Sequence, residues 1–165
     1  MSDNQDSKKI HLESQSGLNR LLAITQYSLA SYLVYAPSWT HSGDEPLAEA
    51  ARRIAAAQQA ETVRIGRLLV RRYGHAESGR FPSRFTEYND VALDYLAQRL
   101  IEHERLMIDG IGRCAEQLAG DPEAKRLAEQ ALAGEKRHLG LLTRLAPQGG
   151  ARGEGHLDEV AAPSG

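Results

Sequence analysis

The feature that most limits how this chain can fold is helical periodicity in four long stretches. Apolar residues recur there every three or four positions, and no stretch alternates polar and apolar residues as a half-buried strand does. Prolines, glycines and capping acids place the stretches near 17–36, 45–73, 90–120 and 122–146. With 165 residues, 41% of them hydrophobic, the chain can build one core. The sequence therefore predicts an all-α domain over 17–146, an N-terminal extension at 1–16 and a flexible C-terminal tail at 147–165.

The lengths of the connections favour one arrangement of these four helices. The first pair is joined by the short segment Pro37–Gly43 and the last pair by about two residues, so each pair should be antiparallel neighbours. About fifteen residues, Gly74–Tyr88, separate the second helix from the third. Extended at ~3.3 Å per residue they reach ~50 Å, whereas a helix of ~28 residues is ~42 Å long. We therefore expect a four-helix bundle with a long crossover between helices 2 and 3.

Charge and composition exclude several classes of partner. The net charge is −2, and no basic strip with interleaved aromatic residues argues for nucleic acid. No apolar run approaches the roughly 18–20 residues that span a bilayer, and the polar N-terminus lacks the apolar segment of a secretory signal. A single cysteine, Cys114, fits a reducing compartment. We expect a cytoplasmic protein with neither nucleic-acid nor membrane partners.

Polar residues interrupt the apolar stripes of two helices at the same spacing. Glu135 and His138 lie three positions apart in a seam otherwise made of alanine and leucine, and Gln58 and Glu61 repeat this in the second helix. A carboxylate and an imidazole one turn apart on one face can hold a metal together. The alternative is a buried hydrogen-bonded layer that fixes the register of the bundle. Both interpretations stay open.

The third helix adds a further carboxylate. At 100° per residue, Glu104 falls on the apolar face, His103 lies to its other side and Glu102 is nearly opposite. The candidate metal ligands are therefore Glu61, Glu104, Glu135 and His138, with His103 in reserve.

The first helix is apolar on two sides. Leu18, Leu22 and Leu29 share one side, while Ile24 and Val34 lie on the other. A helix with two apolar faces in a small bundle is typical of one that also contacts a second subunit. We therefore expect a homo-oligomer, at least a dimer through helix 1.

Three segments resemble bacterioferritin, a member of the ferritin-like superfamily. Residues 19–29, Asn-Arg-Leu-Leu-Ala-Ile-Thr-Gln-Tyr-Ser-Leu, resemble its first helix, Asn-Glu-Leu-x-Ala-Ile-Asn-Gln-Tyr-Phe-Leu. Residues 58–64, Gln-Gln-Ala-Glu-Thr-Val-Arg, resemble its Glu-Met-x-His-Ala-x-Arg, and residues 135–139 resemble its Glu-x-x-His-Ile. The resemblance implies a ferritin-like four-helix bundle that binds or handles iron.

The chain departs from the family at the dinuclear iron centre. Such centres take a Glu from each of two helices and a Glu-x-x-His pair from each of the other two. Here the Glu-x-x-His pair of the last helix is intact as Glu135 and His138. Glu104 can supply the carboxylate of the third helix if the alignment is shifted slightly, and Glu102 is the reserve that needs no shift. Gln58 and Arg20 stand at altered site positions. Tyr27 matches the tyrosine beside the iron, and Gln59 replaces the haem-ligating methionine, so no haem is expected.

These departures imply a degenerate centre. Arg20 cannot be deprotonated, so we expect it to pair with Glu104 or Glu135 in place of one iron. The remaining ligands suit one divalent metal such as iron, manganese or zinc, or none, and a working dinuclear centre is the third alternative. The missing metal ligands predict that any ferroxidase activity is impaired, and whether the protein is an enzyme at all stays open. The alternative function is a metal-free helical assembly or interaction module in which Arg20 replaces the metal.

Overall fold

The computed structural model describes residues 2–35, 45–77, 79–89 and 92–146, and all regular structure in these ranges is helical. The all-α prediction is therefore confirmed. The elements are α1 (Ser2–Gln26), α2 (Leu29–Tyr35), α3 (Glu45–Tyr73), the 3-10 helix η2 (Ser83–Tyr88), α4 (Leu93–Gln117) and α5 (Pro122–Leu145). No helix in the described part of the chain is long and apolar enough to cross a membrane.

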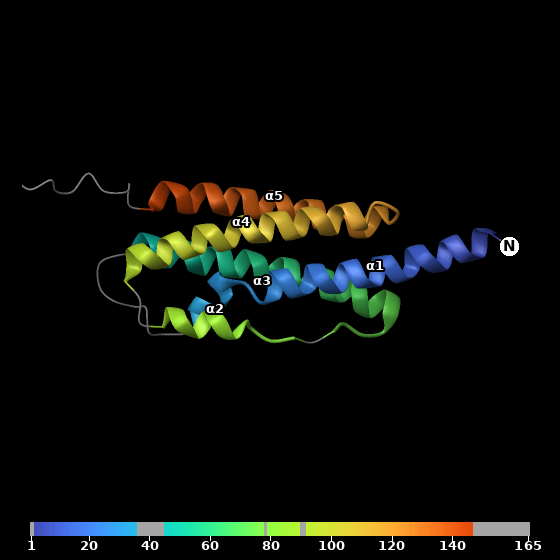
Figure 1. Ribbon diagram of the computed structural model, residues 1–165, viewed down its shortest axis with the longest axis horizontal. Coiled ribbons are helices and arrows are strands. Elements are labelled where there is room, and N and C mark those ends of the chain that lie inside the picture. The colour runs from blue at the N-terminus through green and yellow to red at the C-terminus, as the bar shows by residue number, and fades with distance from the viewer. Residues whose placement is uncertain (1, 36–44, 78, 90–91, 147–165) are drawn as a thin grey trace, which may run out of the picture.

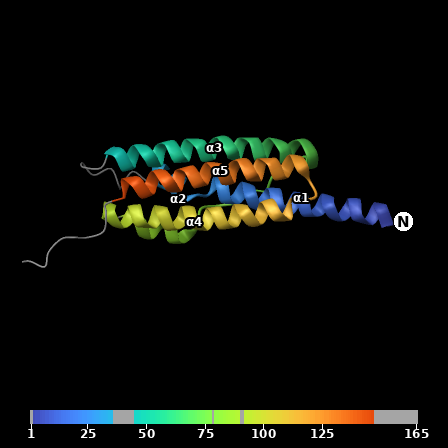
Figure 2. The same ribbon diagram turned by 90° about the horizontal axis from the view of Figure 1, so that it is seen from above.

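The four long helices lie side by side (Figures 1 and 2). Helix α1 packs on α3 and α4, and α5 packs on α3 and α4, while the short α2 packs on α3. The described residues between Gly74 and Asn89 lead from the end of α3 back along the molecule, through η2, to the end where α4 begins (Figure 1). Helices α3 and α4 consequently run in the same direction, and α5 returns beside α4.

The first helix differs from its expected bounds of 17–36. It begins at Ser2, so the expected extension forms the first half of α1 and projects beyond the neighbouring helices (Figure 1). It also breaks after Gln26, because Ser28 caps the separate helix α2: the Ser31 N–H donates to Ser28 Oγ at 3.1 Å. The expected loop Pro37–Gly43 and the tail 147–165 lie outside the described residues.

Helix ends with a local signal fall where the sequence predicts them. Gly74 has φ of 81° and follows the last residue of α3, as a C-terminal glycine does. Asp121 caps α5 by accepting the Ala124 N–H at 3.1 Å, with Pro122 in the first position. The third helix is shorter than expected, since α4 spans Leu93–Gln117 rather than 90–120.

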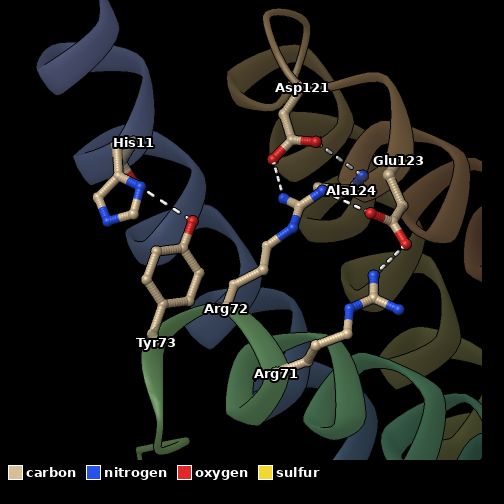
Figure 3. A network of polar contacts seen from close by, with 7 residues as sticks. All are labelled: His11, Arg71, Arg72, Tyr73, Asp121, Glu123 and Ala124. Atoms are coloured by element: carbon tan, nitrogen blue, oxygen red, sulfur yellow. Dashed lines mark hydrogen bonds and ion pairs between the residues drawn. The ribbon is translucent and has the colours of Figure 1, made fainter.

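An ion-pair network connects the end of α3 to the start of α5 (Figure 3). Arg72 at the end of α3 donates to Asp121 and, at 2.6 Å, to Glu123 at the start of α5. Burial alone would raise the pKa of Asp121, but hydrogen bonds from Arg72 and a backbone N–H lower it below its usual value. The neighbouring Tyr73 hydroxyl donates to the carbonyl of His11 at 3.3 Å. The network thus joins α3 to α5, and Tyr73 adds α1.

The interior consists of two apolar clusters separated by polar residues. One cluster gathers buried residues such as Leu21, Ile65 and Ile111, and the other gathers residues such as Leu29 and Leu96. Along every long helix, buried polar side chains fall between the two clusters. This polar layer comprises Thr25, Ser28, Gln58, Thr62, Glu104, Glu135 and the partly buried His138.

The second apolar side of α1 is covered only in part by the chain itself. Ile24 packs on α4, where a Cβ on Gly110 would meet its Cδ1 at 3.1 Å. Val34 and Tyr35 of α2 are 42% and 75% exposed. The dimer through helix 1 stays a prediction, and exposed apolar residues that could serve it lie at the end of α2 and at Ile10 and Leu12 of α1.

Candidate metal centre

The polar layer takes side chains from every long helix. Glu104 comes from α4, Glu135 and His138 come from α5, and Gln58 comes from α3. Ser28 comes from the break between α1 and α2. Each helix presents an apolar stripe to the others above and below this level. Packing of the two apolar clusters therefore turns the intervening polar residues inward.

Three of these side chains can hold a metal ion. One ligand atom from each of Glu104, Glu135 and His138 lies within 4.8 Å of the other two. Glu104 is 0% exposed and Glu135 1% exposed, so the carboxylates are cut off from water. Glu104 Oε2 accepts no hydrogen bond in the described part of the chain, so its only hydrogen bond is the one that protonated Glu104 makes with Glu135. A cation could take the place of that proton, and two carboxylates with one imidazole suit iron, manganese or zinc.

The amide of Gln58 lies between the two carboxylates. Its Nε2 donates to Glu104 Oε1 at 3.2 Å and to Glu135 Oε2 at 3.0 Å. Its Oε1 accepts from the Ser28 hydroxyl at 2.5 Å. His138 Nδ1 lies 2.8 Å from Glu135 Oε2 on the other side. The ligand group is thus held in place by a network that needs no metal.

The two carboxyl groups differ in their affinity for protons. Burial, and then the neighbouring Glu135, raise the pKa of Glu104 to about 10. Burial would also raise the pKa of Glu135, but hydrogen bonds from His138 and Gln58 and the neighbouring Glu104 lower it below its usual value. At neutral pH Glu104 therefore keeps its proton and Glu135 is ionised. A metal ion that binds both carboxylates must displace the proton of Glu104.

The predicted role of Arg20 is wrong. Arg20 is exposed on the outer side of α1, and within the described ranges no ion pair joins it to either carboxylate. Two residues from Leu18 or Leu22, it is about 160° from the buried face at 100° per residue. Among the polar contacts of the described residues, the position between the carboxylates belongs to the Gln58 amide.

Glu61 also lies outside the group. It is half-buried, and its Oε1 accepts from Arg64 at 2.7 Å. The inward position one turn after Gln58 belongs to Thr62, which is 7% exposed and whose hydroxyl lies 3.1 Å from that of Thr25. On the inner face of α3, the residue that follows Gln58 is therefore four positions along the chain and not three.

The remaining predicted residues have other surroundings. The hydroxyl of Tyr27 accepts the Gly79 N–H at 2.9 Å, so Tyr27 joins α1 to the connection after α3. Glu102 is exposed and pairs with Arg99 at 2.8 Å. His103 packs edge-on against Phe85, and burial and then the charge of Arg84 lower its pKa to about 4. Neither Glu102 nor His103 joins the metal-ligand group.

Sequence reasoning missed Ser28 and Thr62. Ser28 was hidden within a helix expected to be continuous, although a serine three residues before Ser31 is compatible with a helix N-cap. The sequence predicted the neighbouring Glu61, and not Thr62, as the inward residue of this turn. Both are hydroxyl residues inside apolar stretches, which is a weak signal without the packing partners.

Comparison with known proteins finds no relative: no family model, curated protein or solved structure matches the chain. The resemblance to bacterioferritin over residues 19–29, 58–64 and 135–139 therefore stays a prediction. What the centre does must be inferred from its own residues.

Proposed function

We propose that this protein is a ferritin-like four-helix bundle that binds one divalent metal ion, iron foremost, and takes part in iron handling. The observation that carries the proposal is the buried group of Glu104, Glu135 and His138, with ligand atoms within 4.8 Å of one another. Two helix pairs joined by a long lengthwise connection are compatible with the ferritin-like arrangement. Iron bound here would be the protein's cargo, and its ferrous and ferric states would supply redox chemistry.

The donor set supports one ion rather than two. A dinuclear carboxylate centre draws ligands from all four helices. Arg20 is on the outside, Glu61 pairs with Arg64, and Gln58 offers a neutral amide in place of a carboxylate. In this proposal Glu104 gives up its proton when the ion enters, and Gln58 and Ser28 keep the carboxylates in position.

The Gln58 network favours a second candidate, a metal-free assembly module. Hydrogen bonds from Gln58 Nε2 to both carboxylates hold the layer without an ion. Such a layer fixes the register of the helices, as buried polar groups do in some bundles. In this candidate Gln58, not Arg20, takes the place of the metal.

Metal titration of the whole chain separates the two candidates. Chelator-stripped protein is titrated anaerobically with Fe²⁺, and separately with Co²⁺ as a spectroscopic probe. We expect one ion per chain, and Glu135→Gln or His138→Gln should weaken binding about 100-fold or more. The exposed Glu102 and His75 supply the matched controls Glu102→Gln and His75→Gln, which should bind as wild type.

The outcomes are distinct. Air exposure of the Fe²⁺-loaded protein reports oxidation through ferric absorbance. Absence of both uptake and ferric absorbance would discard iron handling and favour the metal-free module. Uptake that survives Glu135→Gln and His138→Gln unchanged would place the ion elsewhere.

A further inference from the structure

A second feature lies outside the polar layer, in a cleft of about 390 Å³ between α1, α4 and the connection that contains η2. Its apolar surface comes from residues such as Ile24, Pro82, Leu106 and Met107. The volume is within the range of sites that take small organic molecules, ~300–1,000 Å³. The cleft wall is tied in place, since Tyr27 accepts a hydrogen bond from the Gly79 N–H at 2.9 Å.

Four arginines converge on this cleft from separate segments. Arg20 comes from α1, Arg80 from the connection, Arg84 from η2 and Arg113 from α4. No carboxylate is among the described residues that line it. Four cations therefore surround an apolar cleft without an acid in its lining to neutralise them.

Nearby acids do not cancel this charge. Asp109 precedes Arg113 by one helical turn and Glu87 follows Arg84 by three residues. Among the described residues, neither Asp109 with Arg113 nor Glu87 with Arg84 forms an ion pair, and none of the four arginines pairs with another acid. At the inner wall, His103 Nε2 is buried and lacks a hydrogen-bond partner in the described part of the chain. The four guanidinium groups thus line the cleft beside apolar surface without an ion-pair partner in the described ranges, although Arg84 also lies 5.6 Å from the Phe85 ring centroid.

We propose that this cleft binds a small organic anion, a phosphate or carboxylate group carried on an apolar body. Guanidinium groups match both head groups through paired hydrogen bonds. The apolar residues would take the body, and Arg20 and Arg113 would hold the head group from opposite helices. This proposal is independent of the metal site.

Fluorescence binding with two matched probes tests it. Anilinonaphthalene sulfonate carries an anionic head group, and phenylnaphthylamine has the same ring body without it. We expect saturable, one-site binding of the sulfonate and at least about tenfold weaker binding of the neutral probe. Phenyl phosphate or benzoate should displace the sulfonate, and the more effective of the two identifies the head group.

Variants locate the binding site. The double variant Arg20→Gln/Arg113→Gln should weaken sulfonate binding at least about tenfold, whereas Arg126→Gln/Arg137→Gln, exposed on α5, should not. Ala23→Trp, which fills the cleft but keeps its charges, should weaken both probes. Circular dichroism checks that each variant folds, and Glu135→Gln should retain sulfonate binding even if the metal proposal fails.

The proposal would be overturned by equal affinity for the two probes, by sulfonate binding unchanged in Arg20→Gln/Arg113→Gln, or by displacement with neither competitor. Unchanged binding in Ala23→Trp would likewise place the probe outside the cleft.

Discussion

Replacing Gln58 by glutamate should have opposite effects on the metal-free and the metal-bound protein. The Gln58 Nε2 donates to Glu104 and Glu135, and a glutamate cannot donate when ionised. Without metal, the variant loses a hydrogen bond to the ionised Glu135, worth about 1.5–3 kcal/mol, and one to the protonated Glu104, worth about 0.5–1.5 kcal/mol. It also buries a third carboxyl, so we expect a total destabilisation of about 3–5 kcal/mol. At about 2–4 °C per kcal/mol for a domain of this size, Tm should fall by roughly 6–20 °C.

With metal present the same substitution should help. A third carboxylate adds ligand charge beside Glu104, Glu135 and His138, so Kd should fall by about tenfold or more. A ligand at about 100 times its Kd stabilises the folded state by about 2.7 kcal/mol. Zn²⁺ or Co²⁺ should therefore raise the Tm of Gln58→Glu more than that of wild type.

Thermal unfolding followed by circular dichroism, in chelator and in excess metal, measures both effects. The matched control is Gln59→Glu, a substitution at the adjacent residue, which is exposed on α3. If Gln58→Glu in chelator unfolds at the same temperature as Gln59→Glu, then Gln58 is not held between the carboxylates. If it is destabilised and metal restores nothing, the layer is structural and the metal proposal fails.

Four further predictions follow from single features. Arg20→Glu should leave metal affinity within about twofold in a Co²⁺ titration, because Arg20 is exposed, whereas the resemblance to bacterioferritin predicts a gain. The raised pKa of Glu104, about 10, means that the folded state keeps a proton that the unfolded state releases. Metal-free stability should therefore fall between about pH 7 and pH 9, by up to about 1.4 kcal/mol per pH unit, whereas below about pH 6.5 the lowered pKa of His103 opposes this slope. Urea unfolding across this range should show that slope, and Glu104→Gln should flatten it. Ser28→Ala removes the α2 cap and a hydrogen bond to Gln58, so it should cost about 2–3 kcal/mol in urea unfolding, while Ser16→Ala, exposed on α1, should cost little. Light scattering should return twice the chain mass if helix 1 and α2 form a dimer, and Tyr35→Glu should then return the monomer, because Tyr35 is 75% exposed.

Helix ends and inward faces could be predicted where the signal is local. Gly74 ends α3 and Asp121 begins α5 because their backbone requirements are met within a few residues. Gln58, Glu104 and Glu135 were placed inside because each interrupts a long apolar stripe, and all three are buried. Periodicity fixes the face of a residue well when many apolar neighbours share that face.

The sequence did not correctly place residues whose position depends on the phase of an apolar stripe or on contacts between helices. Successive inward residues of a helix lie three or four positions apart. After Gln58 either Glu61 or Thr62 could face inward, and only the contact with Thr25 decides for Thr62. The break at Ser28 depends on both a local cap and a hydrogen bond to Gln58 on another helix. The position of Arg20 was inferred from alignment with a family rather than from the phase of its own helix, which already places it away from Leu18.

The choice of an amide at residue 58 has a consequence for the charge of the layer. A guanidinium between Glu104 and Glu135 would supply a permanent buried cation. Gln58 is neutral, so the carboxyl pair stays negative when Glu135 is ionised and relies on protons and hydrogen bonds for compensation. Apolar residues of similar size are often as stabilising as a buried charged group or more so, so a bundle kept only for assembly would gain register from this layer but little stability. A cation that replaces the Glu104 proton would recover the electrostatic cost, which favours the metal-binding proposal over the metal-free one.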